Sequence, residues 1–166
     1  PALRPPNPPA ALNSQPLSHP APGRTPARPM SAAASTAASA AAPADDLGPL
    51  VQYVVVRKDL RDGLGWPMGS VIAQGCHASL AAAWEHREDD STQEYLSPEK
   101  LASMHKVVLE IKGETQLNNL ATKLMDAGVK FHLWREQPED YPTALATKPY
   151  YKGEVSQYFK KLNLCK

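Results

Sequence analysis

From Leu50 onward, the apolar residues follow the two spacings that are typical of strands and helices. Residues 50–57 contain the continuous β-branched run Val54, Val55 and Val56, which predicts a strand covered on both faces. In residues 105–111 the apolar side chains alternate with polar ones, which predicts a second strand with one apolar face. Shorter apolar runs predict two further strands, at residues 129–134 and 143–147.

Helices are predicted between and after these strands. Residues 70–87 hold small and apolar side chains around most of the helix circumference, so this helix is expected to pack closely against the sheet. Ser97 followed by Pro98 is typical of a helix start and predicts a short helix through Met104. Two further amphipathic helices are predicted at residues 114–126, where Met125 is expected on the apolar side, and at residues 154–162.

This pattern predicts an α/β fold with a small mixed four-stranded sheet in a three-layer α/β/α sandwich. The expected order of elements is β-α-α-β-α-β-β-α. The first part of the chain is different: twelve of the 17 prolines lie at or before Pro49, and residues 31–44 are almost wholly Ala, Ser and Thr. We therefore predict a disordered segment over residues 1–46 and one domain over residues 47–166. Met30 followed by Ser-Ala-Ala-Ala is typical of a polypeptide start, so we interpret it as a start site.

The charge of the predicted domain is balanced. The first 49 residues hold three of the 18 basic and two of the 17 acidic residues, which leaves 15 of each for the rest. A contact with nucleic acid would therefore depend on a local basic patch and not on a global positive field. Two such clusters are present: Arg57 and Lys58 with Arg61, and the five lysines Lys148, Lys152, Lys160, Lys161 and Lys166.

Cysteine usage and hydropathy indicate a location inside the cell. The two cysteines, Cys76 and Cys165, do not form a disulfide framework, and no long apolar run predicts a membrane span. We expect a cytoplasmic protein with no membrane association. A mitochondrial location is the alternative, because the early arginines fit a transit peptide, although the prolines oppose the amphipathic helix that such peptides form.

A polar helix face stands out against this background. A loop with Gly63, Gly65, Pro67 and Gly69 follows the first strand and precedes the helix that begins near Ser70. On that helix Ser70, Gln74 and His77 are spaced i, i+4 and i+7, so their side chains point the same way and predict a polar site.

Several kinds of site are excluded by spacing. The glycines do not form G-x-G-x-x-G, no Walker loop is present, and residues 68–71 do not form the G-x-S-x-G of a serine hydrolase. Cys76 and His77 are adjacent and point to different sides of a helix, and the other histidines lack ligand spacing. We therefore expect neither a metal ion nor a cofactor.

The residues around this face resemble those of the type-II peptidyl-tRNA hydrolase family. Gly69-Ser-Val-Ile-Ala-Gln-Gly-Cys-His-Ala78 is similar to the family's G-K-x-x-A-Q-x-x-H-A helix start, and Val56-Arg-Lys-Asp-Leu60 is similar to its V-R-x-D-L strand end. The resemblance extends over residues 50–166 and includes Thr143-Ala-Leu-Ala-Thr-Lys-Pro149. A divergent branch of the family is suggested by residues 66–67, 133–134, 136–139 and 157–158.

The resemblance implies an enzyme that cleaves the ester between a peptide and the terminal ribose of tRNA, with tRNA as partner and no metal or cofactor. It implies catalytic roles for Gln74, His77 and Thr143, with Glu136 as the candidate carboxylate. Ser70 stands where the family has a substrate-binding lysine, so Ser70 is a candidate substrate-binding residue without the positive charge. Candidates for contacts with tRNA phosphates are therefore Arg57, Lys58 and Lys148.

Two departures from the family pattern leave other functions open. The lysine is replaced by Ser70, and the family's Asp-Ala-Gly-Arg-Thr loop is replaced by residues 136–140, Glu-Gln-Pro-Glu-Asp. Glu136 is one methylene longer than aspartate, and a shift of that size at a reacting centre costs on the order of a hundredfold in rate. The alternative is a non-catalytic module that binds tRNA or a protein partner, and a hydrolase of another small ester or amide is a third alternative.

Overall fold

A computed structural model describes residues 47–138 and 140–166. Six strands form one sheet in the order β3-β4-β1-β2-β6, and β5 pairs with β1 beside this path. The strands are β1 (Leu50–Arg57), β2 (His105–Ile111), β3 (Phe131–Glu136), β4 (Tyr141–Thr147), β5 (Tyr150–Tyr151) and β6 (Asn163–Leu164). The helices are α1 (Asp59–Asp62), α2 (Met68–Glu85), α3 (Asp90–Tyr95), α4 (Glu114–Asp126) and α5 (Lys152–Val155), with 3-10 turns at Leu101–Ser103 and Ser156–Tyr158.

The sheet is mixed, as predicted. β1 and β2 pair in parallel, and every other described pair is antiparallel. A parallel pair needs a crossover connection, which α2 and α3 supply between these two strands. The α/β class is confirmed, but the sheet has six strands and not four. β5 and β6 are two residues long each, which is too short for an alternating pattern to be visible in the sequence.

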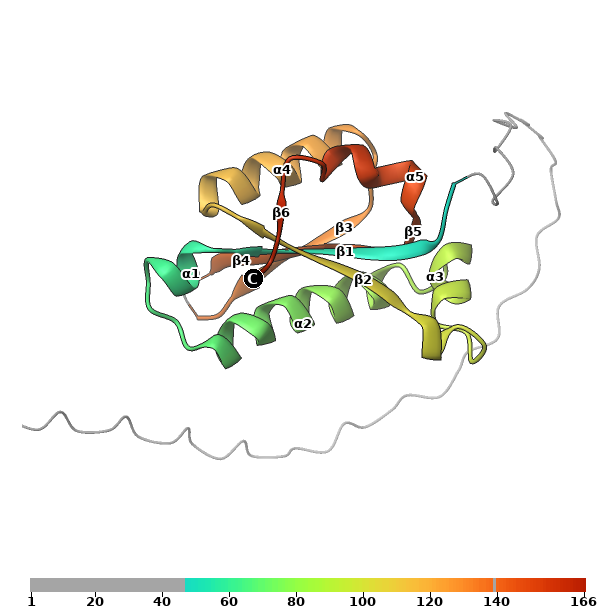
Figure 1. The fold of residues 1–166 in the computed structure, drawn as a ribbon, viewed down its shortest axis with the longest axis horizontal. Coiled ribbons are helices and arrows are strands. Elements are labelled where there is room, and N and C mark those ends of the chain that lie inside the picture. Colours follow the sequence, from blue (N-terminus) through green and yellow to red (C-terminus); the bar gives the residue numbers. More distant parts are fainter. Residues whose placement is uncertain (1–46, 139) are drawn as a thin grey trace, which may run out of the picture. The chain divides into compact units, whose positions relative to one another are not determined.

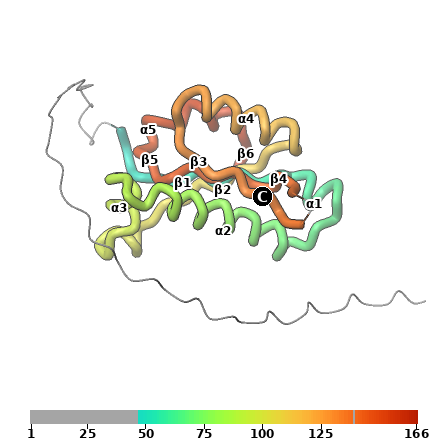
Figure 2. Tube along the Cα trace, turned by 180° about the vertical axis from the view of Figure 1, so that it is seen from behind, coloured from blue at the N-terminus to red at the C-terminus, as the bar shows by residue number. Residues whose placement is uncertain are grey.

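Helices cover both faces of the sheet, with α4 and α5 on one side and α2 and α3 on the other (Figure 1). Seen from behind, α2 again lies across the sheet from α4 (Figure 2). β1 accounts for this arrangement, because successive side chains of a strand point to opposite faces. Its residues Val51, Tyr53 and Val55 join the core formed with α4. Val54 and Val56 join a second core formed with α2. The predicted three layers, with β1 covered on both faces, are therefore present.

Two predicted helices are wrong in position or length. The helix expected to start at Ser97 is replaced by turns, and α3 forms before it, at Asp90–Tyr95. Burial of Thr92 and Tyr95, one helical turn apart, stabilises α3 there, and the Tyr95 hydroxyl donates to the His105 carbonyl at 2.9 Å. The helix expected at residues 154–162 is divided into α5 and a 3-10 turn, after which β6 pairs with β2.

Other features agree more closely with the sequence. α4 ends before Gly128, whose φ of 69° is the left-handed conformation that favours glycine after a helix. Met125, expected on the apolar side of α4, is instead 66% exposed. No helix within the described residues is long and apolar enough to cross a membrane. The predicted disordered segment, residues 1–46, and the start site Met30 lie outside the described residues.

Candidate functional site

The predicted polar face of α2 forms one wall of a cleft of about 500 Å³. The opposite wall is the end of β3 and the turn that follows it. We call this the α2 cleft; its lining residues are Trp66, Pro67, Ser70, Ala73, Gln74, His77, Glu136, Gln137 and Pro138. Ser70, Gln74 and His77 thus face one space, as their helical spacing predicts, and Glu136 reaches the same space from another strand.

The loop before α2 brings Trp66 to the edge of this cleft. Gly65 has a φ of 68°, a conformation that glycine adopts at little cost, and the Trp66 amide donates to the Leu60 carbonyl at 2.8 Å. Trp66 is half-buried against the core on the α2 face of the sheet. The first turn of α2 has no acidic residue, so the partial positive charge of the helix start remains available beside the cleft.

Thr143 fixes the side chain of Gln74 by a hydrogen bond. The Thr143 hydroxyl donates to Gln74 Oε1 at 2.7 Å, and both side chains are almost fully buried, with exposed fractions of 0% and 2%. The Gln74 amide nitrogen has no protein acceptor among the described residues. Because its carbonyl end is fixed on Thr143, the amide presents N–H donors to the cleft. This pair joins two predicted site residues that the sequence places 69 positions apart.

His77 and Glu136 are linked through Trp134. The imidazole of His77 stacks on the indole of Trp134, with ring centroids 4.5 Å apart and an interplanar angle of 20°. The indole N–H of Trp134 donates to Glu136 Oε2 at 3.0 Å. One aromatic side chain therefore orients both the imidazole and the carboxylate.

Trp134 is a site residue that the sequence marked only as a feature of the family branch. The sequence contained one indication of this role. Trp134 precedes Glu136 by two positions in a strand, and side chains with that spacing lie on the same face of a sheet. The β3–β4 pairing has a register shift between Trp134 and Arg135, which no sequence pattern indicates.

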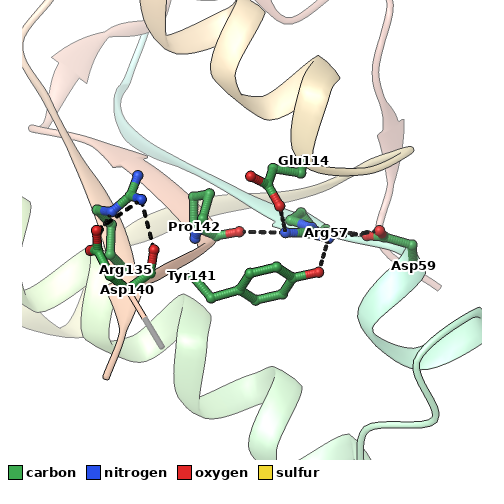
Figure 3. Close-up of polar contacts among 7 residues, drawn as sticks. All are labelled: Arg57, Asp59, Glu114, Arg135, Asp140, Tyr141 and Pro142. Atoms are coloured by element: carbon green, nitrogen blue, oxygen red, sulfur yellow. Dashed lines mark hydrogen bonds and ion pairs between the residues drawn. The ribbon is translucent and has the colours of Figure 1, made fainter. Parts of the chain in front are cut away.

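Arg57 does not lie on the surface, where its place in the sequence led us to expect it. It is 2% exposed, and its guanidinium is surrounded by the carboxylates of Asp59 and Glu114, the Pro142 carbonyl and the Tyr141 hydroxyl (Figure 3). These partners occupy the guanidinium inside the protein, which argues against the expected contact with phosphate.

The electrostatics of Arg57 agree with this structural role. Burial acts to lower the Arg57 pKa, but hydrogen bonds to Asp59 and Tyr141 outweigh burial, and the pKa lies above its ordinary value. By binding the Pro142 carbonyl at 2.8 Å, Arg57 fixes the backbone one residue before Thr143. Arg57 therefore stabilises the α2 cleft indirectly, by holding the backbone beside Thr143.

Lys148 is also less available than expected. It is 8% exposed, and its ammonium donates to Ser91 Oγ at 2.6 Å, which ties α3 to the end of β4. Burial lowers the Lys148 pKa, and Asp89 opposes this shift. Lys58 remains on the surface beside Glu110, at 3.2 Å. Neither lysine lines the α2 cleft, so of the four predicted substrate-binding residues only Ser70 does.

The charge of the α2 cleft is negative. Glu136 is the one Asp, Glu, Lys or Arg among its described lining residues. Within residues 47–138 and 140–166, no group of three His, Cys, Asp or Glu side chains is arranged to hold a metal ion. The cleft thus combines an amide donor, an imidazole and a carboxylate, which is a set suited to placing water and an ester carbonyl.

Comparison with known proteins finds a matching family model and several relatives. The family model described as "Peptidyl-tRNA hydrolase PTH2" matches residues 50–165. The "Putative peptidyl-tRNA hydrolase PTRHD1" of Mus musculus is 48% identical over 118 residues, which span 70% of this chain and 83% of that relative. The Homo sapiens relative of the same name gives the same values. The "Probable peptidyl-tRNA hydrolase 2" of Dictyostelium discoideum is 30% identical over 125 residues, 72% of this chain and 57% of that relative.

Proposed function

Since the chain belongs to the peptidyl-tRNA hydrolase PTH2 family, we propose that it hydrolyses the ester between a peptide or amino acid and the 3′ ribose of tRNA. The observation that supports this most directly is the arrangement in the α2 cleft. Gln74, His77 and Glu136 face one space from two elements, and Thr143 fixes the orientation of Gln74. The reaction adds water across the ester, so that a carboxylic acid and a free ribose hydroxyl are formed.

In this proposal Gln74 binds the ester carbonyl. Attack by water places negative charge on the carbonyl oxygen, and a fixed N–H donor stabilises that charge more than it stabilises the neutral ester. Thr143 holds Gln74 Oε1, so the amide does not have to reorient during the reaction. The start of α2 adds a weak positive potential where Pro67 and Ser70 line the cleft.

His77 and Glu136 act on the water. The imidazole of His77 and the carboxylate of Glu136 are ionisable acceptors in the cleft lining, and acceptance of a proton from water makes the water a better nucleophile. Trp134 holds both groups, through the stack on His77 and the hydrogen bond to Glu136. The proton then passes to the leaving ribose oxygen.

Contacts with the phosphates of tRNA lie outside the cleft in this proposal. Lys58 is the remaining surface candidate of the three predicted basic residues, because Arg57 and Lys148 are buried. The described domain has no large excess of positive charge, so we expect few phosphate contacts and a shallow dependence of binding on salt.

A second function has one specific observation in its favour. No lysine or arginine lines the α2 cleft among the described residues. A module that retains the fold and binds tRNA or a protein partner without turnover would tolerate this loss. The two functions differ in whether bound substrate is cleaved.

Single-turnover deacylation of tRNA esters by the full chain tests the proposal. The rate should fall to background in the double variant Gln74→Ala/His77→Ala. The matched control is Gln93→Ala/His105→Ala, which changes the same residue types at exposed positions outside the cleft. Equal background rates in the wild type and both variants would exclude hydrolysis and favour the binding module.

A further inference from the structure

A second cavity, of about 280 Å³, lies between α2 and β2 on the face of the sheet that α2 covers (Figure 1). We call it the β2 groove. Its base is formed by Val54 and Val56 of β1, and its two walls include Ile72 of α2 and Val108 of β2. These side chains are all apolar.

The close approach of α2 to β1 accounts for the groove. A Cβ atom at Gly75 would lie 3.4 Å from side-chain atoms of both Val54 and Val56, so glycine lets the helix lie directly against β1. The neighbouring strand is left uncovered: Val108 pairs in register with Val54, yet it is 41% exposed. Ile72, on the facing wall, is 58% exposed. Adjoining exposed apolar side chains around a cavity are typical of a binding site for an apolar group.

Lys106 also lines the β2 groove, two residues before Val108 on the same face of β2. Its ammonium donates to Gln52 Oε1 at 2.6 Å. Gln52 is fully buried, and the Ser79 hydroxyl donates to the same oxygen at 2.7 Å. The ammonium is therefore fixed in place, and its other N–H groups have no protein acceptor among the described residues.

The charge of Lys106 is not balanced. Within residues 47–138 and 140–166, no Asp or Glu oxygen is paired with its ammonium, which lies 5.3 Å from the centre of the Tyr95 ring. Partial burial lowers the pKa of Lys106, and Cys76 opposes this shift. This is the direction expected for an ammonium that has lost hydration without gaining a carboxylate. An anion bound beside it would restore the lost stabilisation.

We propose that the β2 groove binds a small apolar carboxylate, such as a medium-chain fatty acid, with its carboxylate at Lys106 and its chain over Val54 and Val56. A polyanion such as RNA is disfavoured, because Lys106 is the one Asp, Glu, Lys or Arg among the described lining residues. The β2 groove and the α2 cleft have no lining residue in common, so this binding does not depend on the proposed hydrolysis.

The volume of the β2 groove sets the length of the chain. At roughly 30 Å³ for each water-sized group, 280 Å³ holds about nine or ten non-hydrogen atoms. Octanoate is of this size. Hexanoate is two methylene groups shorter and should bind roughly tenfold more weakly, because each buried methylene group contributes to affinity.

Titration calorimetry on the full chain tests the proposal, with octanoate and octanamide as probes. Octanamide has the same chain and a head group of similar shape, but it carries no charge. A hydrogen bond between charged partners is about twice as strong as one between neutral partners, so at neutral pH octanoate should bind roughly tenfold more tightly than octanamide.

Two substitutions in the β2 groove test where the probe binds. Lys106→Met removes the ammonium while Ser79 still donates to Gln52, so octanoate should bind no more tightly than octanamide. Ile72→Glu places a carboxylate in the groove at an exposed helix position, where it competes for Lys106 and repels the probe. The affinity for octanoate should fall by roughly tenfold or more.

The matched controls lie outside the β2 groove. Lys123→Met removes a lysine from α4, which covers the other face of the sheet. Leu80→Glu introduces a carboxylate at an exposed apolar position of α2 that does not line the groove. Both variants should retain the affinity for octanoate and the preference over octanamide.

Loss of the preference in Lys106→Met, together with weaker binding of octanoate by Ile72→Glu, would support the proposal. Absence of saturable octanoate binding by the wild type, equal binding of the two probes, or octanoate binding unchanged in both groove variants would overturn it. Deacylation of tRNA esters is measured separately, so its failure would remove the proposed hydrolysis and leave the binding of octanoate unaffected.

Discussion

The indole N–H of Trp134 donates to the carboxylate of Glu136 at 3.0 Å, while the ring of the same residue stacks on His77. A hydrogen bond from a neutral donor to a carboxylate contributes about 1.5–3 kcal/mol when it orients the charged group. Trp134 thus fixes the spacing between the two groups that we assign to the water. It is a positioning residue, because it acts through Glu136 and His77.

Replacement of Trp134 by phenylalanine tests this role. Phenylalanine retains a ring that can stack on His77 but has no N–H for Glu136. We expect the single-turnover rate to fall by roughly tenfold, which corresponds to about 1.4 kcal/mol in the barrier. Trp84→Phe is the control, because Trp84 is 66% exposed on α2 and does not line the cleft. A rate unchanged by Trp134→Phe would show that Glu136 needs no orientation by the indole.

Thr143→Val removes a hydroxyl and changes the shape of the side chain little. The nearly buried Gln74 oxygen would lose its donor, so we expect the free energy of unfolding to fall by about 1–3 kcal/mol and the deacylation rate to fall as well. Thr147→Val offers a comparison in the same strand, since Thr147 is equally buried but accepts from the Tyr53 amide. It should lose stability while retaining the rate. Thr143→Ser should retain both; a rate equal to wild type in Thr143→Val would contradict the role of the hydroxyl.

Arg57→Met should lower the free energy of unfolding, because Arg57 has a structural role. Its removal leaves the Asp59 carboxylate and the Pro142 carbonyl without their buried donor, which is expected to cost roughly 3 kcal/mol in the free energy of unfolding. Arg57→Lys should recover only part of this loss, because one ammonium cannot replace a planar group with several donors. Chemical denaturation measures both effects. Arg61→Met, at a site nearer the surface, should change stability little; an equal loss there would remove the special role of Arg57.

His86 predicts a pH dependence of stability. Burial, and then the positive charge of Lys130, lower the His86 pKa in the folded protein below its ordinary value of about 6.5. The unfolded chain therefore binds the proton more tightly, so the contribution of this group to stability is complete above about pH 6.5 and is lost as the pH falls through the folded pKa. Urea denaturation between pH 7 and pH 5 should show a steeper decline for the wild type than for His86→Asn. Parallel curves would contradict the shift.

Local patterns in the sequence are sufficient for the main elements of this fold. The continuous valines of β1 and the periodicity of α2 and α4 depend on backbone geometry alone, so these elements lie close to the predicted positions. For the same reason, helical spacing alone is enough to assign Ser70, Gln74 and His77 to one face.

Contacts between distant segments could not be predicted in this way. The sequence does not indicate that Thr143 lies under Gln74, or that Glu136 meets His77 through Trp134, because these contacts depend on strand order and on the register shift in β3. Arg57 illustrates the same limit: a charged residue at a strand end is typical of a surface, and only the packing of β4 and α4 shows its partners.

Residue types and local periodicity therefore specify which groups of this chain are available for chemistry, and both can be read along the sequence. Which of these groups meet depends on how separate elements pack. Packing brings Gln74 onto Thr143 and buries Arg57, and neither result follows from the neighbours of these residues along the chain.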